Sequence, residues 1–229
     1  MNLSPKISIA LCTFNGEKYL KRQLDSFPKQ TLLPFELVAC DDASSDDTCR
    51  ILEDFSHTAP FPVRIVRNAR NLGLRKNFSQ AASLCQGDYV AFSDQDDIWS
   101  PDKLEHGIRA MQKTEQEYGT GIPLLVHSDL SLIDAEGHVT APSCMKVLHM
   151  RHEPVDPLRT LLVRNFVFGC TSLCNRALIQ ESLPFPDVIA NHDGWCALIA
   201  ASRGKILFIP EPKVLYRQHQ GTVTDGAVS

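Results

Sequence analysis

Short apolar segments of strand type alternate with segments of helical periodicity through the first half of this 229-residue chain. The strand-type segments are residues 7–12, 35–40, 63–66 and 89–92. Between them apolar side chains recur at helical spacing, as they do at Phe78, Ala81, Ala82 and Cys85. Strands that alternate with helices form βαβ units, so we predict an α/β fold with a mostly parallel sheet flanked by helices.

The second half is less regular. Its predicted strands are residues 124–127, 132–133, 166–171, 206–209 and 214–216. A helix is predicted to begin near His192, and Gly119 to Pro123 is the predicted hinge because Gly and Pro interrupt regular structure. We therefore divide one domain into residues 1–120 and residues 121–229. The chain ends soon after the last predicted strand, which is compatible with a fragment of a longer protein.

Composition excludes several classes of protein. A formal net charge of −4 gives no general attraction to nucleic acid. A membrane-spanning helix needs roughly 20 apolar residues, and the most apolar long stretch, residues 160–174, contains Arg164 and Asn165. The eight cysteines form no Cys-x-x-Cys pair, which favours reduced, structural thiols. We therefore expect a cytoplasmic protein without a nucleic-acid partner.

Polar residues follow each of the first four predicted strands. They are the segments 13–16, 41–46, 71–76 and 93–97. In parallel sheets, ligands bind beyond the carboxyl ends of the strands. The sequence therefore predicts one ligand site built from these four segments.

Asp94-Gln95-Asp96 is the central motif of that edge. Two carboxylates one residue apart can face the same hard cation, and Mg²⁺ or Mn²⁺ commonly links such carboxylates to substrate phosphates. The alternative is helix capping, because Ser100-Pro101-Asp102 is typical of a helix start. Residues 97–99 lead into that helix and are expected to serve packing.

Taken in order, the motifs resemble the family 2 glycosyltransferases. The resemblance covers roughly the first 105 residues and rests on Thr13–Gly16, Asp41–Thr48, Asn71–Gly73, Gly87–Tyr89 and Ser93–Trp99. It implies the GT-A fold, a Rossmann-like, mostly parallel sheet with a smaller mixed sheet on the acceptor side. Ala43 stands where the family usually has glycine. The Asp-Gln-Asp-Asp-Ile-Trp run resembles bacterial rhamnosyltransferase-like members that build surface polysaccharide such as lipopolysaccharide.

The resemblance assigns donor-binding roles to residues after the first three strands. Asp41 and Asp42 would recognise the base or ribose, with turn formation as the alternative. Thr13 and Asn15 would line the nucleotide pocket or simply form a strand-to-helix turn. Lys76 would pair with the donor diphosphate or be solvated at a helix start.

The same resemblance assigns the metal ligands. Asp96 is the first choice of ligand, and Asp94 would bind the metal, a metal-bound water or the donor ribose. Gln95 would contact the donor. His219 would be a third ligand or donate to the diphosphate, against the alternative of a solvated histidine. Arg217 would neutralise phosphate charge or form a surface salt bridge.

Asn191-His192-Asp193-Gly194-Trp195 resembles the acidic acceptor-site motif of the family. Asp193 would be the general base that takes the proton of the acceptor hydroxyl. The alternative is that Asp193 or Asn191 caps the helix that follows. His192 and Trp195 would contact the acceptor.

The reaction implied is a single inverting displacement that needs Mg²⁺ or Mn²⁺. It would move a sugar, with rhamnose as the candidate, from a dTDP- or UDP-sugar to a hydroxyl of a glycan or lipid-linked glycan. A lipid-linked acceptor would bring the protein to the inner face of the membrane as a peripheral protein. The alternatives are a UDP-hexose or UDP-N-acetylhexosamine transferase, and a non-catalytic nucleotide-sugar-binding module. A nucleotidyltransferase would carry a Gly-rich, basic phosphate loop after the first strand, which residues 13–17 do not provide.

Overall fold

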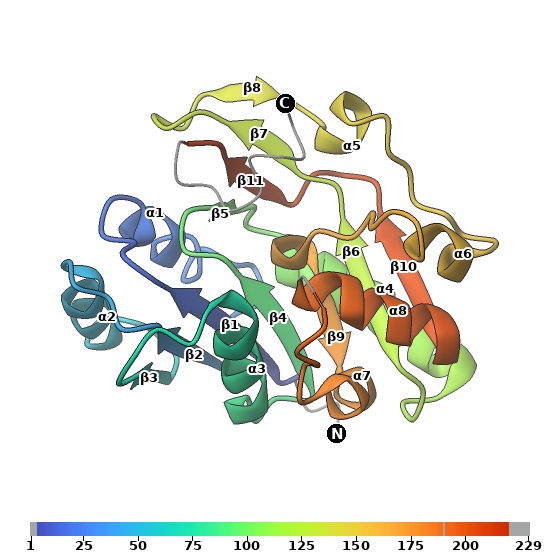
Figure 1. The fold of residues 1–229 in the computed structure, drawn as a ribbon, viewed down its shortest axis with the longest axis horizontal. Helices are drawn as coiled ribbons and strands as arrows, with labels where there is room; N and C mark the ends of the chain where they lie inside the picture. The colour runs from blue at the N-terminus through green and yellow to red at the C-terminus, as the bar shows by residue number, and fades with distance from the viewer. Residues whose placement is uncertain (1–3, 190, 220–229) are drawn as a thin grey trace.

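The computed structural model describes residues 4–189 and 191–219. Its large sheet contains β1 (Ile7–Thr13), β2 (Glu36–Asp41), β3 (Val63–Arg67), β4 (Tyr89–Ser93), β6 (Leu124–Ser128), β9 (Leu173–Asn175) and β10 (Lys205–Ile209). The strand order is β10-β6-β9-β4-β1-β2-β3 (Figure 1). Strands β3, β2, β1 and β4 are parallel to one another, whereas β9 runs antiparallel between β4 and β6. The predicted mostly parallel sheet is confirmed.

A smaller mixed sheet lies beside the carboxyl ends of β1 and β4 (Figure 1). It contains β5 (Ile98–Trp99), β7 (Ser131–Ile133), β8 (Val139–Ala141) and β11 (Val214–Arg217). Strand β11 lies between β5, to which it is antiparallel, and β7, to which it is parallel. This arrangement brings the last described segment of the chain next to the acidic run that precedes β5.

Helices cover both faces of the large sheet. The described part of the chain contains α1 (Leu20–Leu24), α2 (Thr48–Ser56), α3 (Leu74–Leu84), α4 (Lys103–Tyr118), α5 (Cys144–Val147), α6 (Pro157–Leu161), α7 (Arg176–Ser182) and α8 (His192–Arg203). Of these, α5 lies beside the small sheet (Figure 1). Period-2 alternation in β1 sends Ile9 and Leu11 toward α1, α2 and α4, and sends Ala10 and Cys12 toward α3, α7 and α8. Among the described residues, no helix has the length and apolar character needed to cross a membrane.

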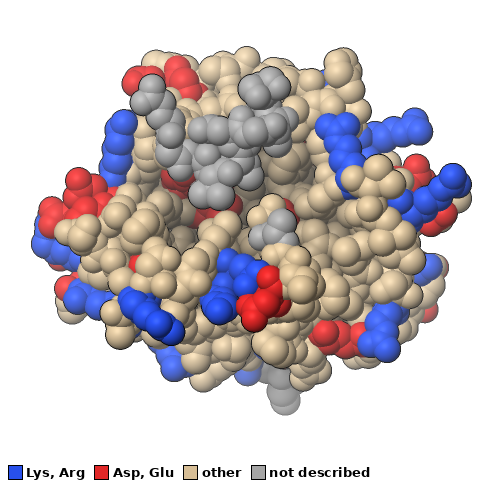
Figure 2. All heavy atoms as spheres, in the orientation of Figure 1, with Lys and Arg blue, Asp and Glu red and all other residues tan. Residues whose placement is uncertain are grey.

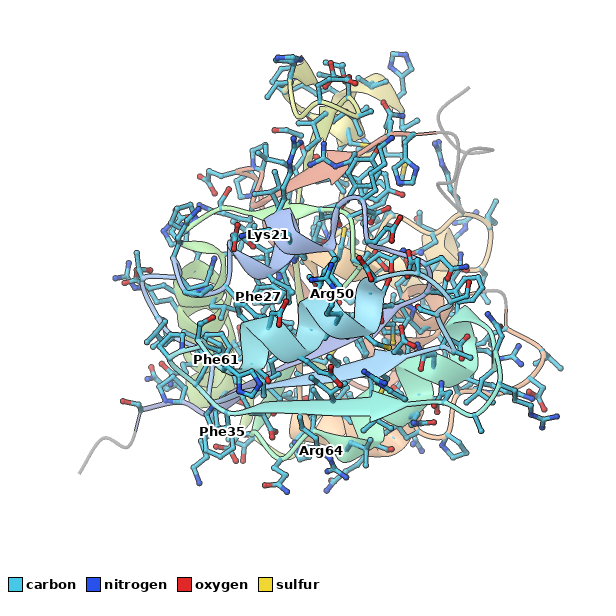
Figure 3. The ribbon with its side chains drawn as sticks, turned by 90° about the vertical axis from the view of Figure 1, so that its left-hand side faces the viewer. Lys21, Phe27, Phe35, Arg50, Phe61 and Arg64 are labelled. Atoms are coloured by element: carbon cyan, nitrogen blue, oxygen red, sulfur yellow. The ribbon has the colours of Figure 1, made fainter. Side chains whose placement is uncertain are left out.

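The face covered by α1 and α2 shows how amphipathic segments build this core. Figure 3 views the molecule from this side, with α2 in front of the sheet and β3 at its edge. Phe27 and Phe61 are buried there, whereas Lys21 and Arg50 form exposed ion pairs along the helix surfaces. The burial of apolar side chains on both sheet faces fixes the strands, and therefore fixes the positions of the residues that follow them.

The strand predicted at residues 166–171 is wrong. The segment instead ends in a 3₁₀ turn, Gly169–Thr171, and the strand in this region is β9. Side chains take over the hydrogen bonds that a ladder would supply: the Asn165 amide bonds both backbone groups of Val167, and the Ser172 hydroxyl donates to the Gly169 carbonyl. An apolar run alone does not distinguish these two outcomes.

The predicted hinge follows α4, which ends at Tyr118 and is capped by Gly119 with a φ of 85°. Strands β6 and β10, from the second half, extend the same sheet as the strands of the first half. The functional division into residues 1–120 and 121–229 stays a prediction.

Candidate functional site

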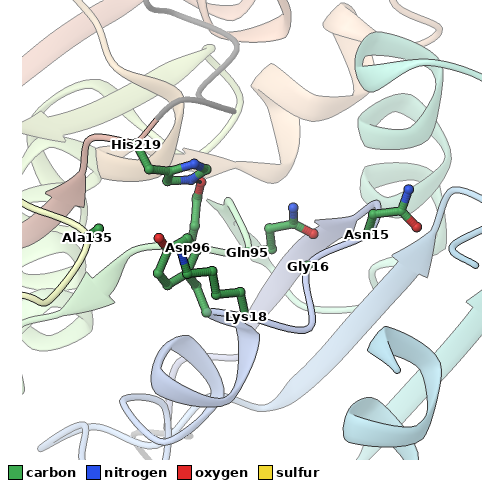
Figure 4. Close-up of a pocket in the computed structure, with 8 residues that line it drawn as sticks. Asn15, Gly16, Lys18, Gln95, Asp96, Ala135 and His219 are labelled. Carbon is green, nitrogen blue, oxygen red and sulfur yellow. Dashed lines mark hydrogen bonds and ion pairs between the residues drawn. The ribbon is translucent and has the colours of Figure 1, made fainter. Parts of the chain in front are cut away.

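Two neighbouring cavities open at the carboxyl ends of β1, β2 and β4. The first, of about 360 Å³, is lined by residues of both halves, including Thr13, Asp42, Asp94 and Asp193. The second, of about 520 Å³, lies between the start of α1 and the β7–β8 turn (Figure 4). Both cavities are lined by Gln95, Asp96 and His219. Figure 2 shows acidic side chains deep in the hollow at the middle of this face.

Asp41 anchors the turn that follows β2. Its carboxylate is buried and accepts a hydrogen bond of 2.9 Å from the Thr13 hydroxyl. It also accepts hydrogen bonds from the backbone N–H and the hydroxyl of Ser44. Turn formation, the alternative recognised in the sequence, therefore accounts for Asp41, which does not line either cavity.

Asp42 lines the first cavity and at the same time shapes its wall. One oxygen accepts from the backbone N–H of Leu72 at 2.7 Å and from the Asn68 amide at 2.9 Å. The other accepts from the backbone N–H of Gly73 at 2.8 Å. Asp42 thus fixes the loop that begins α3, where Gly73 has a φ of 84°. Base or ribose recognition by Asp42 stays a prediction, since a carboxylate has about four acceptor positions.

The Gln95 side chain joins the acidic run to the end of β1. Its Oε1 accepts from the backbone N–H of Phe14 at 2.8 Å, and its Nε2 donates to the Phe14 carbonyl at 3.0 Å. Asn15, with a φ of 47°, turns the chain and accepts a hydrogen bond from the backbone N–H of Ser45. A Cβ at Gly16 would stand 2.3 Å from Gln95 Oε1, so a larger residue there would displace the Gln95 side chain from Phe14. In the sequence, the Asn15-Gly16 pair indicates a turn, but it does not indicate that the turn packs against Gln95.

The carboxylates of the acidic run are crowded and poorly compensated. Burial, with the charges of Asp96 and Asp193, raises the pKa of Asp94 to about 7. Burial, with the charges of Asp96 and Asp94, raises the pKa of Asp97 well above its ordinary value. His219 Nε2 lies 2.9 Å from Asp96 Oδ2. Helix α4 begins only at Lys103, so neither Asp94 nor Asp96 caps it.

This cluster fits a divalent cation. Oxygen-rich, crowded carboxylates are the ligand set of Mg²⁺ and Mn²⁺, and a bound cation relieves their mutual repulsion. Ligand atoms of Asp94, Asp97 and Cys170 also lie within 4.8 Å of one another among the described residues. Hard cations prefer oxygen to thiol sulfur, and burial raises the pKa of the Cys170 thiol well above its ordinary value. We therefore keep Asp94, Asp96 and His219 as the predicted ligands.

Arg217 is buried rather than solvated. Its Nε donates to the Asp96 carbonyl at 2.9 Å, and its Nη1 donates to the carbonyls of Asp134 and Ala135. Its guanidinium carbon lies 4.8 Å from the centre of the Tyr19 ring. The surface salt bridge considered for Arg217 is therefore wrong, because β11 runs inside the small sheet. Arg217 lines neither cavity. Its hydrogen bonds connect β11 to the acidic run and to the β7–β8 turn.

Replacing Arg217 with methionine is expected to destabilise the fold by about 3 kcal/mol. The change leaves buried carbonyls without donors, each of which costs about 1–3 kcal/mol. Urea unfolding measures the difference, and Arg50→Met is the matched control because its ion pairs with Asp47 and Asp54 are exposed and worth less than about 1 kcal/mol. Equal unfolding free energies for the two variants would show that Arg217 is not a structural link.

Asp193 stands at the start of α8 and faces the first cavity. Its oxygens accept from the backbone N–H of Gly169 at 3.1 Å and of Gly194 at 2.6 Å. Burial raises the pKa of its carboxyl to about 6, although both hydrogen bonds oppose the rise. Asn191 is the N-cap residue of α8, but its side chain forms no capping hydrogen bond. Asp193 is thus a fixed carboxylate that titrates close to neutral pH.

The structure gathers most predicted site residues but not all. His192 lines the first cavity and stacks on Phe78, with ring centroids 4.0 Å apart, and burial lowers its pKa to about 3. Trp195 is half-buried against the core instead, and its indole N–H donates to the Ser182 carbonyl at 3.0 Å. Lys76 lies outside both cavities with Nζ 3.8 Å from Asp187.

The family model described as "Glycosyl transferase family 2" matches residues 8–127, which is more than half of the chain. The chain belongs to glycosyl transferase family 2. The matched range contains the predicted donor-side residues Asp42, Asp94 and Asp96, whereas Asp193 and His219 lie beyond it. Family membership therefore bears most directly on residues 1–120, the predicted nucleotide-sugar-binding half.

Curated relatives of this family 2 chain include named glycosyltransferases. The dTDP-rhamnosyl transferase RfbG of Shigella flexneri is 27% identical over 236 residues, covering 96% of this chain and 75% of RfbG. The putative glycosyltransferase EpsE of Bacillus subtilis is 30% identical over 132 residues, covering 58% of this chain and 48% of EpsE. An uncharacterised Mycobacterium tuberculosis protein is 28% identical over 219 residues, and the chain spans only 59% of its length.

Solved structures confirm the GT-A fold. S. aureus TarS, residues 1–349, superposes with a TM-score of 0.72 at 19% identity, covering 93% of this chain and 60% of that one. A mannosyltransferase from Pyrobaculum calidifontis, in complex with GDP-Man and Mn²⁺, superposes with a TM-score of 0.67 at 18% identity, covering 99% and 59%. At these identities the likeness concerns the fold alone.

Proposed function

We propose that this family 2 chain transfers a sugar from a nucleoside-diphosphate sugar to a hydroxyl group, with inversion at the anomeric carbon. One observation carries the proposal: two kinds of carboxylate line the same cavity. Asp94 and Asp96 form a pair suited to a divalent cation, and Asp193 is a separate carboxylate whose pKa is raised to about 6. A single displacement needs a site for the departing diphosphate and a base for the attacking hydroxyl, and the cavity offers both.

The donor end of the reaction falls to the residues after β1, β2 and β4. Thr13, Asn15 and Asp42 border the space for the nucleoside, and Gln95 holds that wall to the acidic run. Asp94, Asp96 and His219 would hold Mg²⁺ or Mn²⁺. When bound, the cation supplies charge neutralisation to the departing nucleoside diphosphate. The Mn²⁺ in the mannosyltransferase complex supports a metal in this fold.

The acceptor end of the reaction falls to Asp193. Its carboxylate takes the hydroxyl proton while the acceptor oxygen bonds to the anomeric carbon and the bond to the diphosphate oxygen breaks. The N–H groups of Gly169 and Gly194 hold the carboxylate in place without protonating it. A carboxyl whose pKa is about 6 is deprotonated at neutral pH and is still a stronger base than an ordinary aspartate. His192, neutral and buried, forms part of the acceptor-side wall.

For the donor we propose dTDP-rhamnose, and for the acceptor a growing bacterial surface glycan, free or lipid-linked. The support is that RfbG, named a dTDP-rhamnosyl transferase, matches 96% of this chain. A lipid-linked acceptor would place the protein at the inner face of the membrane. A UDP-N-acetylhexosamine donor is the second candidate, because TarS was solved with UDP-GlcNAc and superposes with a TM-score of 0.69.

A panel of donors tests this function. The purified chain is offered dTDP-rhamnose, UDP-glucose, UDP-GlcNAc and GDP-mannose with Mn²⁺, and release of nucleoside diphosphate is measured with and without chelator. We expect metal-dependent release from dTDP-rhamnose at least about tenfold above the other donors, a difference of about 1.4 kcal/mol. Preference for a UDP-sugar would replace the rhamnose proposal. Tight binding without release from any donor, at any acceptor concentration, would favour a non-catalytic binding module.

A further inference from the structure

Arg75, at the start of α3, clasps the segment that leads to the candidate base. Its Nη2 lies 2.6 Å from Asp187 Oδ1, and its Nη1 donates to the backbone carbonyls of Asp187 and Ile189, the latter at 3.1 Å. The Arg75 side chain is only 22% exposed, whereas Asp187 is 78% exposed. Two of the three contacts therefore hold the backbone of the segment and not merely a surface carboxylate.

The start of α3 is itself fixed from the donor side. Asp42 accepts the backbone N–H groups of Leu72 and Gly73, immediately before the helix. The Asn77 amide, one turn further on, donates to the Cys40 carbonyl of β2. Arg75 therefore stands on a rigid platform built from the wall of the nucleotide cavity.

The other end of the contact leads to Asp193. Ser79 of α3 accepts a hydrogen bond from the backbone N–H of Phe185, which holds the same segment at a second point. Phe78, one residue earlier on α3, stacks on His192 at 4.0 Å between ring centroids. His192 is followed directly by Asp193 at the start of α8. Helix α3 thus contacts both the segment before α8 and the first turn of α8.

We propose that Arg75 is a positioning residue that sets the catalytic base, Asp193, against the donor cavity. Arg75 itself lines neither cavity, so it acts through the segment it clasps. The inference rests on the proposed role of Asp193 as general base. Its chemical basis is that a planar guanidinium with several donors can bind two carbonyls and a carboxylate together, which lysine cannot reproduce. A shift of about 1 Å in a reacting group can lower a rate by about 10²-fold.

The kinetic test compares three variants. Arg75→Met is expected to lower kcat at least about tenfold while leaving the donor KM and the affinity for nucleoside diphosphate within about twofold of wild type. Arg75→Lys is expected to recover part of the loss. Asp187→Asn should have a smaller effect, because the backbone carbonyl contacts of Arg75 remain. The matched control is Arg203→Met, which removes an exposed pair with Glu181 that links α8 to α7, and it should keep wild-type kinetics.

Amide hydrogen exchange provides a readout that does not depend on activity. Peptides covering residues 185–189 and 191–196 should exchange faster in Arg75→Met, with no change in Arg203→Met. Unchanged exchange together with unchanged kcat would overturn the positioning role. If Arg75→Met exchanges faster but the wild type transfers no sugar, the contact of Arg75 with the segment is supported and the proposed function is refuted. A tenfold rise in donor KM with an unchanged kcat would also overturn the proposal, since it would make Arg75 a donor-binding residue.

Discussion

Replacing Asp193 with asparagine is expected to lower the rate of sugar transfer by about 10²- to 10⁴-fold, the usual contribution of a general base. Asparagine keeps the size of the side chain and one acceptor oxygen, which can serve only one of the N–H groups of Gly169 and Gly194. It removes the capacity to take a proton and leaves the donor-side residues unchanged. Affinity for nucleoside diphosphate should therefore stay within about twofold of wild type, as measured by calorimetry beside steady-state kinetics.

The pH dependence of the wild type gives an independent view of the same group. Asp193 must be deprotonated to act as a base, and burial raises its pKa to about 6. At saturating donor, acceptor and metal, kcat should be level above that pH and should fall about tenfold per unit below it. Residual transfer by Asp193→Asn should lose this dependence.

Asp88→Asn is the matched control for this experiment. Asp88 is exposed, just before β4 and at the opposite end of that strand from the acidic run. Its replacement should leave the rate unchanged. If Asp193→Asn keeps a rate near that of Asp88→Asn, then Asp193 is not the base and caps or orders α8 only.

The second large effect is expected at Asp96. Asp96→Asn should lower metal-dependent transfer by about 100-fold or more, because it removes a charged oxygen ligand from the predicted cation site. Asp96 lines both cavities, and His219 Nε2, the third predicted ligand, lies 2.9 Å from its Oδ2. Calorimetric titration of Mn²⁺ in the presence of nucleoside diphosphate measures the loss directly.

Asp25→Asn serves as the control for Asp96. Asp25 is an aspartate at the C-terminal end of α1, where it forms an exposed ion pair with Lys21. This control should retain the Mn²⁺ affinity and the rate of the wild type. If Asp96→Asn binds Mn²⁺ as tightly as the wild type, Asp96 is not a metal ligand. The group formed by Asp94, Asp97 and Cys170 would then be the next candidate for the metal site.

Much of the fold followed from local sequence patterns. The first four strands and the helices between them were predicted because each carries its own periodicity, and burial on two sheet faces selects that periodicity. The segment 166–171 failed for a physical reason: it is as apolar as a strand, but Asn165 and Ser172 satisfy its backbone instead of a neighbouring strand. Nothing in the local pattern distinguishes those two sources of hydrogen bonds.

The site was predictable in position and less so in contacts. The strand-end rule places Asp42, Asp94 and Asp96 at one edge because parallel strands end together. The burial of Arg217 could not be predicted from the sequence. Its partners are the backbone carbonyls of Asp96, Asp134 and Ala135, and every residue type has such a carbonyl. Lys76 and Trp195 were placed near the ligand by motif order, yet helix geometry turns them toward Asp187 and Ser182.

A crystal of the chain soaked with Mn²⁺ and a nucleoside diphosphate tests the central claim most directly. Anomalous scattering locates the metal without reference to activity. We predict one strong peak at coordination distance from a carboxylate oxygen of Asp96, with the diphosphate next to the metal and the nucleoside beside Asp42. A nucleotide bound in this cavity with no metal at the acidic run, or a metal bound away from Asp94 and Asp96, would contradict the account.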